Sequence, residues 1–216
     1  MFESKSFINR LIFIFPMTEN TTTLVPVDDY LTAGVHIGTK YKNGFSSKFI
    51  HRSRADGLKI IDTEQIDNRL KVLINLLSRF DSSEIVIMGR RENAKTPLKL
   101  FSKLLGCDVF TGRYLPGKLT NAALEDFKEY KVVIVCDPLT DKNILNEAFE
   151  QGTFTVGFCD TNNKTEKLDL VVPINNKGKK SLALALMLVA KHYLNNKGIL
   201  KEKDFDYTLE DFSGEE

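Results

Sequence analysis

Three aspartates, Asp62, Asp137 and Asp160, directly follow short apolar runs rich in β-branched residues. If these runs are parallel strands, the carboxylates lie where α/β sheets bind ligands and could act as acid, base or metal ligand. An aspartate after a strand also caps the next helix or begins a turn, and Asp137-Pro138 is typical of such a turn. We favour the structural role. An enzyme acting on a phosphorylated small molecule, with Lys177 on the phosphate, is the alternative hypothesis.

Two common phosphate-binding motifs are absent. None of the thirteen glycines has another glycine two positions away, as the dinucleotide-binding fingerprint requires. The stretch Gly178-Lys179-Lys180-Ser181 resembles the end of a phosphate loop, but Lys180 stands at the Ser/Thr position and Pro173 replaces the first glycine. These departures exclude a Walker motif and a dinucleotide site.

The histidines and cysteines form no pattern of a metal site or an activated nucleophile. The residues concerned are His36, His51, His192, Cys107, Cys136 and Cys159. Each cysteine lies in a β-branched or aromatic run, where a thiol packs as a small hydrophobe, and this usage fits a reducing cytoplasm. We therefore expect no metal, no cofactor and no catalytic residue.

Lysines cluster where an apolar helix from Leu182 is expected to begin. Lys177, Lys179 and Lys180 oppose the positive end of the helix dipole, which an external anion would explain. Free helical N–H groups and ammonium groups hold phosphate oxygens well, and the pair Asn175-Asn176 adds side-chain donors. A solvated loop that tolerates a small penalty explains the same residues equally well.

Three further basic groups fall in expected loops, with the aromatic residues Tyr41, Phe45, Phe49 and Tyr114 interleaved. Four such groups on one small domain favour a broad surface that contacts RNA phosphates and stacks on bases. The predicted rRNA-binding residues are Lys40, Lys42, Lys48, Arg52, Arg54, Arg90, Arg91, Arg113, Lys118, Asn175, Asn176, Lys177, Lys179 and Lys180.

Short β-rich runs alternate with helical patterns and would position these loops. The runs cover residues 58–61, 85–88, 107–110, 132–136, 154–158 and 170–172. Asp62 is expected to cap one helix, Thr96-Pro97 to begin another and Gly106 to end it. The alternation predicts a single doubly wound α/β domain, flavodoxin-like, with a mostly parallel sheet and helices on both faces. Residues 24–56 would form an N-terminal helix and a glycine-marked loop laid against it.

Charge divides the chain unevenly. Residues 202–216 hold seven acids and one lysine, a net charge of −6, so the chain's +1 leaves +7 on residues 1–201. A basic body of this kind could sit on a polyanion. We expect an α/β domain over residues 24–201 and an acidic C-terminal tail, residues 202–216, that projects to solvent or to a basic neighbour.

Residues 1–23 are expected to be an N-terminal extension, either disordered or the product of a start assigned upstream of Met17. Lys5, Arg10 and the apolar residues 11–15 superficially suggest a secretory signal, but the run is too short and no cleavage site follows. Residues 182–190 are nine apolar residues, short of the ~20 that span a bilayer, and predict a buried helix.

Several of these segments, read as strings, resemble the S-two family of small-subunit ribosomal proteins in its archaeal and eukaryotic branch, whose eukaryotic member is the SA or laminin-receptor-precursor protein. The matching segments are residues 24–26, 30–31, 33–39, 54–57, 112–113, 116–117, 119–121, 137–138, 141–142, 159–161, 173 and 175–178. They keep the family's order along most of the chain.

The resemblance implies a flavodoxin-like structural constituent of the small ribosomal subunit in the cytoplasm, supporting assembly and translation without catalysis. It implies contacts with small-subunit ribosomal RNA and neighbouring ribosomal proteins, between head and body near the messenger exit. Neither a membrane nor an obligate homo-oligomer is expected. The coiled-coil insertion of bacterial members and the long C-terminal extension of animal members are missing, and Thr39 replaces the second histidine of the bacterial motif, so the archaeal form fits best. Residues 90–95 depart from the family's usual pattern, so the resemblance supports the RNA contacts of that loop least.

Overall fold

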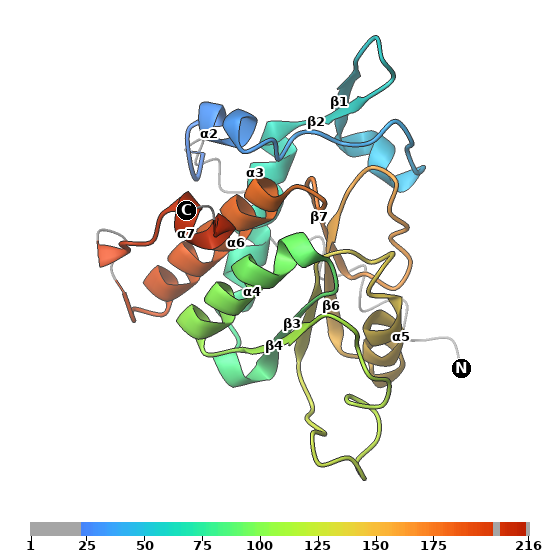
Figure 1. The fold of residues 1–216 in the computed structure, drawn as a ribbon, viewed down its shortest axis with the longest axis vertical. Helices are drawn as coiled ribbons and strands as arrows, with labels where there is room; N and C mark the ends of the chain where they lie inside the picture. The colour runs from blue at the N-terminus through green and yellow to red at the C-terminus, as the bar shows by residue number, and fades with distance from the viewer. Residues whose placement is uncertain (1–22, 201–203, 215–216) are drawn as a thin grey trace.

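The computed structural model describes residues 23–200 and 204–214, and its centre is a five-stranded parallel sheet (Figure 1). The strand order is β4-β3-β5-β6-β7. The strands are β3 (Ile85–Gly89), β4 (Asp108–Thr111), β5 (Val132–Val135), β6 (Phe154–Cys159) and β7 (Leu170–Pro173). This order and the all-parallel pairing confirm the predicted flavodoxin-like α/β fold.

Helices cover both faces of the sheet. Helices α3 (Thr63–Leu77), α4 (Glu92–Leu105) and α6 (Lys179–Asn196) lie on one face, where α6 contacts both of the others. Helix α5 (Lys142–Gln151) covers the opposite face and contacts β5 and β6. Ile85 and Ile87 of β3 join the larger hydrophobic core, and the alternate residues Val86 and Met88 join the smaller one under α5.

The first predicted strand exists but lies outside this sheet. Strand β2 (Lys59–Ile61) pairs antiparallel with β1 (Ile50–Ser53) in a separate hairpin, and β1 was not predicted. A short β-rich run predicts extended backbone but not its pairing partner, so the expectation that the sheet begins here is wrong. The expected N-terminal helix is α2 (Val27–Thr32), and a 3-10 turn, η1 (Phe45–Phe49), precedes the hairpin.

The helix ends that the sequence predicted are confirmed with one exception. The Asp62 carboxylate accepts a hydrogen bond from the Glu64 backbone and caps α3, and Gly106 ends α4 at a φ of 71° that favours glycine. Helix α4 begins at Glu92 and not at the predicted Thr96-Pro97. Pro97 lies in the second turn, where it removes one backbone bond, and its buried ring packs beside Ala94 and Leu98 on the sheet side.

The described part of the C-terminal segment, residues 204–214, packs back onto the domain. Helix α7 (Leu209–Ser213) contacts α4 and α6, and Phe212 is fully buried in the larger core. Its Thr208 cap and Asp211 form a reciprocal capping box. This differs from the expected projecting tail because Phe205, Leu209 and Phe212 give an acidic segment an apolar side. The expectation for residues 1–22 falls outside the described residues.

Two smaller predictions concern burial. The apolar residues 182–190 lie inside α6 and are almost all buried, and no described helix is long and apolar enough to cross a membrane. Cys107, Cys136 and Cys159 are free thiols in the core, as expected. The remaining short element, η2 (Ser82–Glu84), leads into β3.

Candidate nucleic-acid interface

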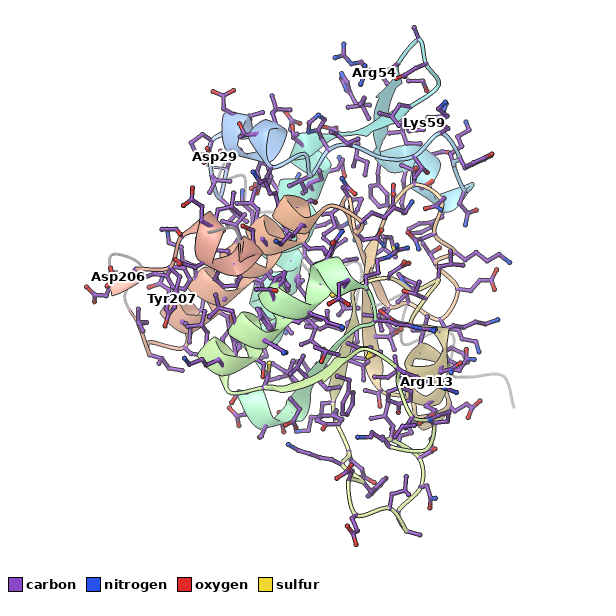
Figure 2. All side chains as sticks on the ribbon, viewed as in Figure 1. Asp29, Arg54, Lys59, Arg113, Asp206 and Tyr207 are labelled. Carbon is purple, nitrogen blue, oxygen red and sulfur yellow. The ribbon has the colours of Figure 1, made fainter. Side chains whose placement is uncertain are left out.

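All four predicted basic groups lie around the carboxyl edge of the sheet. In a parallel sheet the loops after β3, β4, β6 and β7 meet at one edge, and these loops carry Arg90, Arg113 and Lys177. The fourth group lies on residues 35–61, here called the N-terminal excursion. Figure 2 shows Arg54, Lys59 and Arg113 on the side of the molecule away from Asp29 and Asp206.

The N-terminal excursion is tied to the sheet edge by hydrogen bonds to loops after β6 and β7. The Asn175 backbone N–H donates to the Val35 carbonyl at 2.9 Å, and Thr39 N–H donates to the Thr161 hydroxyl at 3.0 Å. The same Thr161 hydroxyl donates to the Tyr41 carbonyl at 2.8 Å. Thr39, which replaces a histidine of the bacterial motif, therefore serves as an anchor for the excursion.

Gly38 lets the two segments approach each other. A Cβ at this position would come within 2.6 Å of the Thr161 Cγ2 atom and 3.0 Å of the Lys59 carbonyl oxygen. No larger residue fits unless the neighbouring backbone moves. Ser46 adds a hydroxyl bond to the Thr161 carbonyl at 2.8 Å. The excursion is thus held at a defined distance from the edge of the sheet.

Cations on the excursion and nearby loops face solvent. Within the described part of the chain, Lys40, Lys42, Arg52, Arg90 and Arg113 are exposed and form no ion pair. Surface charges without an intramolecular partner are available to an external anion. The positive potentials of several such charges along one edge add to one another. These five side chains are exposed, and their contact with RNA stays a prediction.

Arg91 has a different environment. Its Nε donates to the Asp137 carboxylate at 2.7 Å, and Nη2 forms a second bond to the same oxygen. Asp137 is almost fully buried, and its other oxygen accepts bonds from the Asn163 amide at 2.7 Å and the Leu139 N–H at 3.0 Å. The guanidinium therefore balances a buried carboxylate before it can serve any ligand.

Asp141 completes this group, called the central polar cluster: Arg91, Asp137, Asp141, Asn163 and Asn176. The Asp141 carboxylate accepts bonds from the Arg90 N–H at 3.1 Å and the Asp137 N–H at 3.3 Å. Burial, together with the neighbouring Asp137 charge, raises the pKa of Asp141 to about 7, although the backbone donors and Arg91 lower it. The cluster lies between β3 and β5, where the strand order reverses.

Asn176 belongs to the cluster and has no exposed surface. Its amide nitrogen donates to the Phe158 carbonyl at 2.9 Å and to Asn163 Oδ1 at 3.2 Å. Asn175 shapes the next turn, because its Oδ1 accepts from the N–H groups of Lys177 and Gly178 and its Nδ2 donates to the Gly34 carbonyl. Both amides of the predicted contact set therefore bond within the protein, and we give them positioning roles.

The lysines at the start of α6 also have intramolecular contacts. Lys177 Nζ lies 3.0 Å from the Asp160 carboxylate, whose side chain is 1% exposed, while Lys177 itself is 37% exposed. Lys179 Nζ lies 3.3 Å from the Gly214 carbonyl at the end of α7. Lys180 is exposed. The unfavourable placement of these cations beside the helix dipole is partly explained by buried acid and by the C-terminal segment.

The remaining predicted residues flank the edge. Lys118 pairs with Asp126 at 3.2 Å, and Arg54 with Asp56 at 3.7 Å in the exposed hairpin. The connection between β4 and β5 that carries Lys118 and Arg113 is held by Glu147 of α5, which accepts bonds from Tyr114 Oη at 2.9 Å and the Gly117 N–H at 2.8 Å. Lys48 Nζ lies 3.8 Å from the centroid of the Phe45 ring.

The aspartates at the strand ends have structural roles, as favoured from the sequence. Asp62 caps α3, Asp137 pairs with Arg91 and opens a turn, and Asp160 pairs with Lys177. Among the described residues, no group of His, Cys, Asp or Glu could hold a metal ion. The carboxylates that an enzyme would use at this edge already have protein partners.

Comparison with known proteins identifies the family of the chain. The family model for ribosomal protein S2 matches residues 30–131 and 123–195, which is most of the described domain. The chain belongs to the ribosomal protein S2 family. It is similar to the small ribosomal subunit protein uS2 of the archaea Nanoarchaeum equitans (41% identity, 88% of this chain and 95% of the relative), Methanoregula boonei (42%, 85% and 92%) and Thermoplasma acidophilum (40%, 89% and 97%).

Membership of the S2 family confirms the family resemblance and the archaeal type expected from the sequence motifs. It also places the chain among structural ribosomal proteins and not among enzymes. Sequence reasoning missed Thr161 and Asn163, which anchor the edge, because their partners lie far away along the chain. The Cys159-Asp160-Thr161 segment of the family resemblance was the available signal for Thr161.

Proposed function

We propose that this protein is a structural constituent of the small ribosomal subunit in the cytoplasm and binds small-subunit ribosomal RNA through the carboxyl-edge loops and the N-terminal excursion. The relatives that cover most of the chain carry the name of a small-subunit protein. The observation that carries the RNA-binding proposal is the set of exposed, unpaired cations: Lys40, Lys42, Arg52, Arg90 and Arg113. They share an edge whose acids are buried and already bonded.

The other predicted contacts divide into two groups. Lys48, Arg54, Lys118, Lys179 and Lys180 would extend the phosphate-contacting surface. Arg91, Lys177, Asn175 and Asn176 would support it by holding the loops, because their polar groups bond to buried parts of the domain. Neighbouring small-subunit proteins would contact the remaining surface, and the protein would bind as a single copy.

Sedimentation of the tagged chain with small ribosomal subunits at increasing salt tests this function. We expect co-sedimentation at low ionic strength and release as salt rises, since each neutralised phosphate contributes a slope of roughly 0.7 to 0.9 in a log–log plot of affinity against salt. Binding that does not respond to salt, or no binding to small-subunit RNA at low ionic strength, would contradict the proposal.

A further inference from the structure

Arg69 of α3 is a half-buried cation with no carboxylate partner among the described residues. Its guanidinium carbon lies 5.6 Å from the centroid of the Phe49 ring, a cation–π contact. No hydrogen bond or ion pair joins its side chain to residues 23–200 or 204–214. A guanidinium has five N–H donors in a fixed fork, so most of this binding capacity is unused within the described chain.

A second cation approaches the same ring. Lys48 Nζ lies 5.0 Å from the centroid of Phe49 and 3.8 Å from that of Phe45. The two rings pack edge to face with centroids 5.8 Å apart. Phe49 is buried and Phe45 is 40% exposed, so the pair forms a wall that begins in the core and ends at the surface. Lys48 and Arg69 are thus placed by one aromatic pair.

The placement is rigid because η1 and α3 are bonded to each other. The Asp62 N–H, at the cap of α3, donates to the Phe49 carbonyl at 2.9 Å. Arg69 lies two turns farther along the same helix, on a stretch whose neighbours Ile66, Leu70 and Leu73 are buried. The helix and the turn therefore fix where the two cations lie relative to the Phe49 ring.

Electrostatics make this arrangement unfavourable without an anion. Burial lowers the pKa of Arg69, and burial followed by the charge of Arg69 lowers the pKa of Lys48. Both shifts mean that the charged forms are less stable here than in water. Two partly desolvated like charges without a counter-charge destabilise the free protein, and an anion held between them would remove that cost.

We propose that Lys48 and Arg69 together bind one phosphodiester group of ribosomal RNA at the Phe45–Phe49 pair, which makes Arg69 an RNA contact of α3. The inference rests on the proposed function and adds Arg69, which lies on a helix and outside the basic loops that the sequence indicated. A guanidinium fork suits two oxygens of one phosphate, and a lysine adds a point charge. The unpaired Lys40, Lys42 and Arg52 lie on the same excursion, so an extended polyanion fits better than an isolated anion.

Binding of the full chain to a small-subunit ribosomal RNA transcript, measured at several salt concentrations, tests the pair. Arg69→Gln should weaken binding about tenfold and lower the log–log salt slope by roughly 0.7 to 0.9, the value of one phosphate contact. Arg69→Lys should keep most of the slope while losing part of the affinity, because it retains the charge but not the fork. Arg79→Gln, just beyond the C-terminal end of α3 and so at the end opposite the Asp62 cap that bonds Phe49, is the matched control and should leave the slope unchanged.

Two further measurements separate a ligand role from a structural one. Since Arg69 carries an uncompensated charge in the free protein, Arg69→Gln should not lower the unfolding midpoint. Lys48→Gln should weaken binding as well, and the double variant should lose less than the sum of the single losses, because both side chains would serve one phosphate.

The outcomes are distinct. Unchanged affinity and slope for Arg69→Gln, with wild-type binding intact, would overturn this inference and leave the proposed function standing. Absence of wild-type binding would overturn the function itself. Titration with inorganic phosphate at constant ionic strength separates the two phosphate sources: little stabilisation is expected, and saturation at submillimolar phosphate, lost in Arg69→Gln, would show a small-molecule site instead.

Discussion

The central polar cluster and the N-terminal excursion both carry basic residues at the same edge. The arginine of the cluster is paired with a buried acid, whereas several cations of the excursion have no partner in the described chain. In the cluster, Arg91 lies against the buried Asp137 and balances the charge of that carboxylate. On the excursion, Lys40, Lys42 and Arg52 are exposed and have no partner in the described chain. The difference teaches that a basic loop residue serves the fold when a buried acid faces it and serves binding when none does.

The largest expected effect comes from breaking the cluster. Asp137→Ala removes the partner of Arg91 and of the Asn163 amide, so the free energy of unfolding should fall by about 3–5 kcal/mol in urea denaturation. Asp126→Ala, which removes an exposed partner of Lys118, should change it by less than about 1 kcal/mol. Equal effects for the two variants would remove the distinction between the regions.

The anchoring of the excursion gives a smaller effect. Gly38→Ala places a methyl group against Thr161 and the Lys59 carbonyl, and should cost about 1–3 kcal/mol of stability. Gly44→Ala is the matched control on the same segment, since nothing lies within 4 Å of the added atom. Thermal unfolding of both variants measures the difference, and a stable Gly38→Ala protein would show that the excursion is not held to the edge as described.

Dependence on pH sharpens the comparison further. The folded-state pKa of Asp141, about 7, lies above the value of about 3.9 for an unfolded aspartate. The folded state therefore holds more protons between these values, and the contribution of Asp141 to stability falls as pH rises from about 4 to about 7 and is constant above. Asp141→Asn removes this loss, so its stability relative to wild type should rise across that window in urea denaturation. A constant difference across that window would contradict the cause given for the raised pKa.

Local patterns predicted much of the fold. The apolar runs of β3, β5 and β6, the Asp62 cap and the Gly106 terminus depend on adjacent residues, and all are confirmed. The pairing of β2 with β1 was missed because short extended runs do not specify their partners. The packing of α7 was missed because the acids of the segment outnumber the three apolar residues that anchor it.

The candidate site was less predictable. The sequence indicates which loops are basic, and Lys40, Lys42 and Arg113 are exposed there, while their contact with RNA stays a prediction. It does not show that Arg91 meets Asp137, 46 residues away, because this contact depends on the order of the strands. Arg69 was missed for a related reason: on a helix it has the pattern of an ordinary surface residue, and only the approach of Phe49 distinguishes it.

The central claim is that unpaired cations of the excursion meet RNA phosphates, and one paired measurement tests it most directly. Lys40→Gln/Lys42→Gln and the control Lys99→Gln/Lys103→Gln, two exposed lysines of α4, change the net charge equally. For binding to small-subunit ribosomal RNA, the excursion variant should lower the log–log salt slope by roughly 1.4 to 1.8, the value of two phosphate contacts, and the control should leave it unchanged. Equal slopes for the two variants would contradict the account.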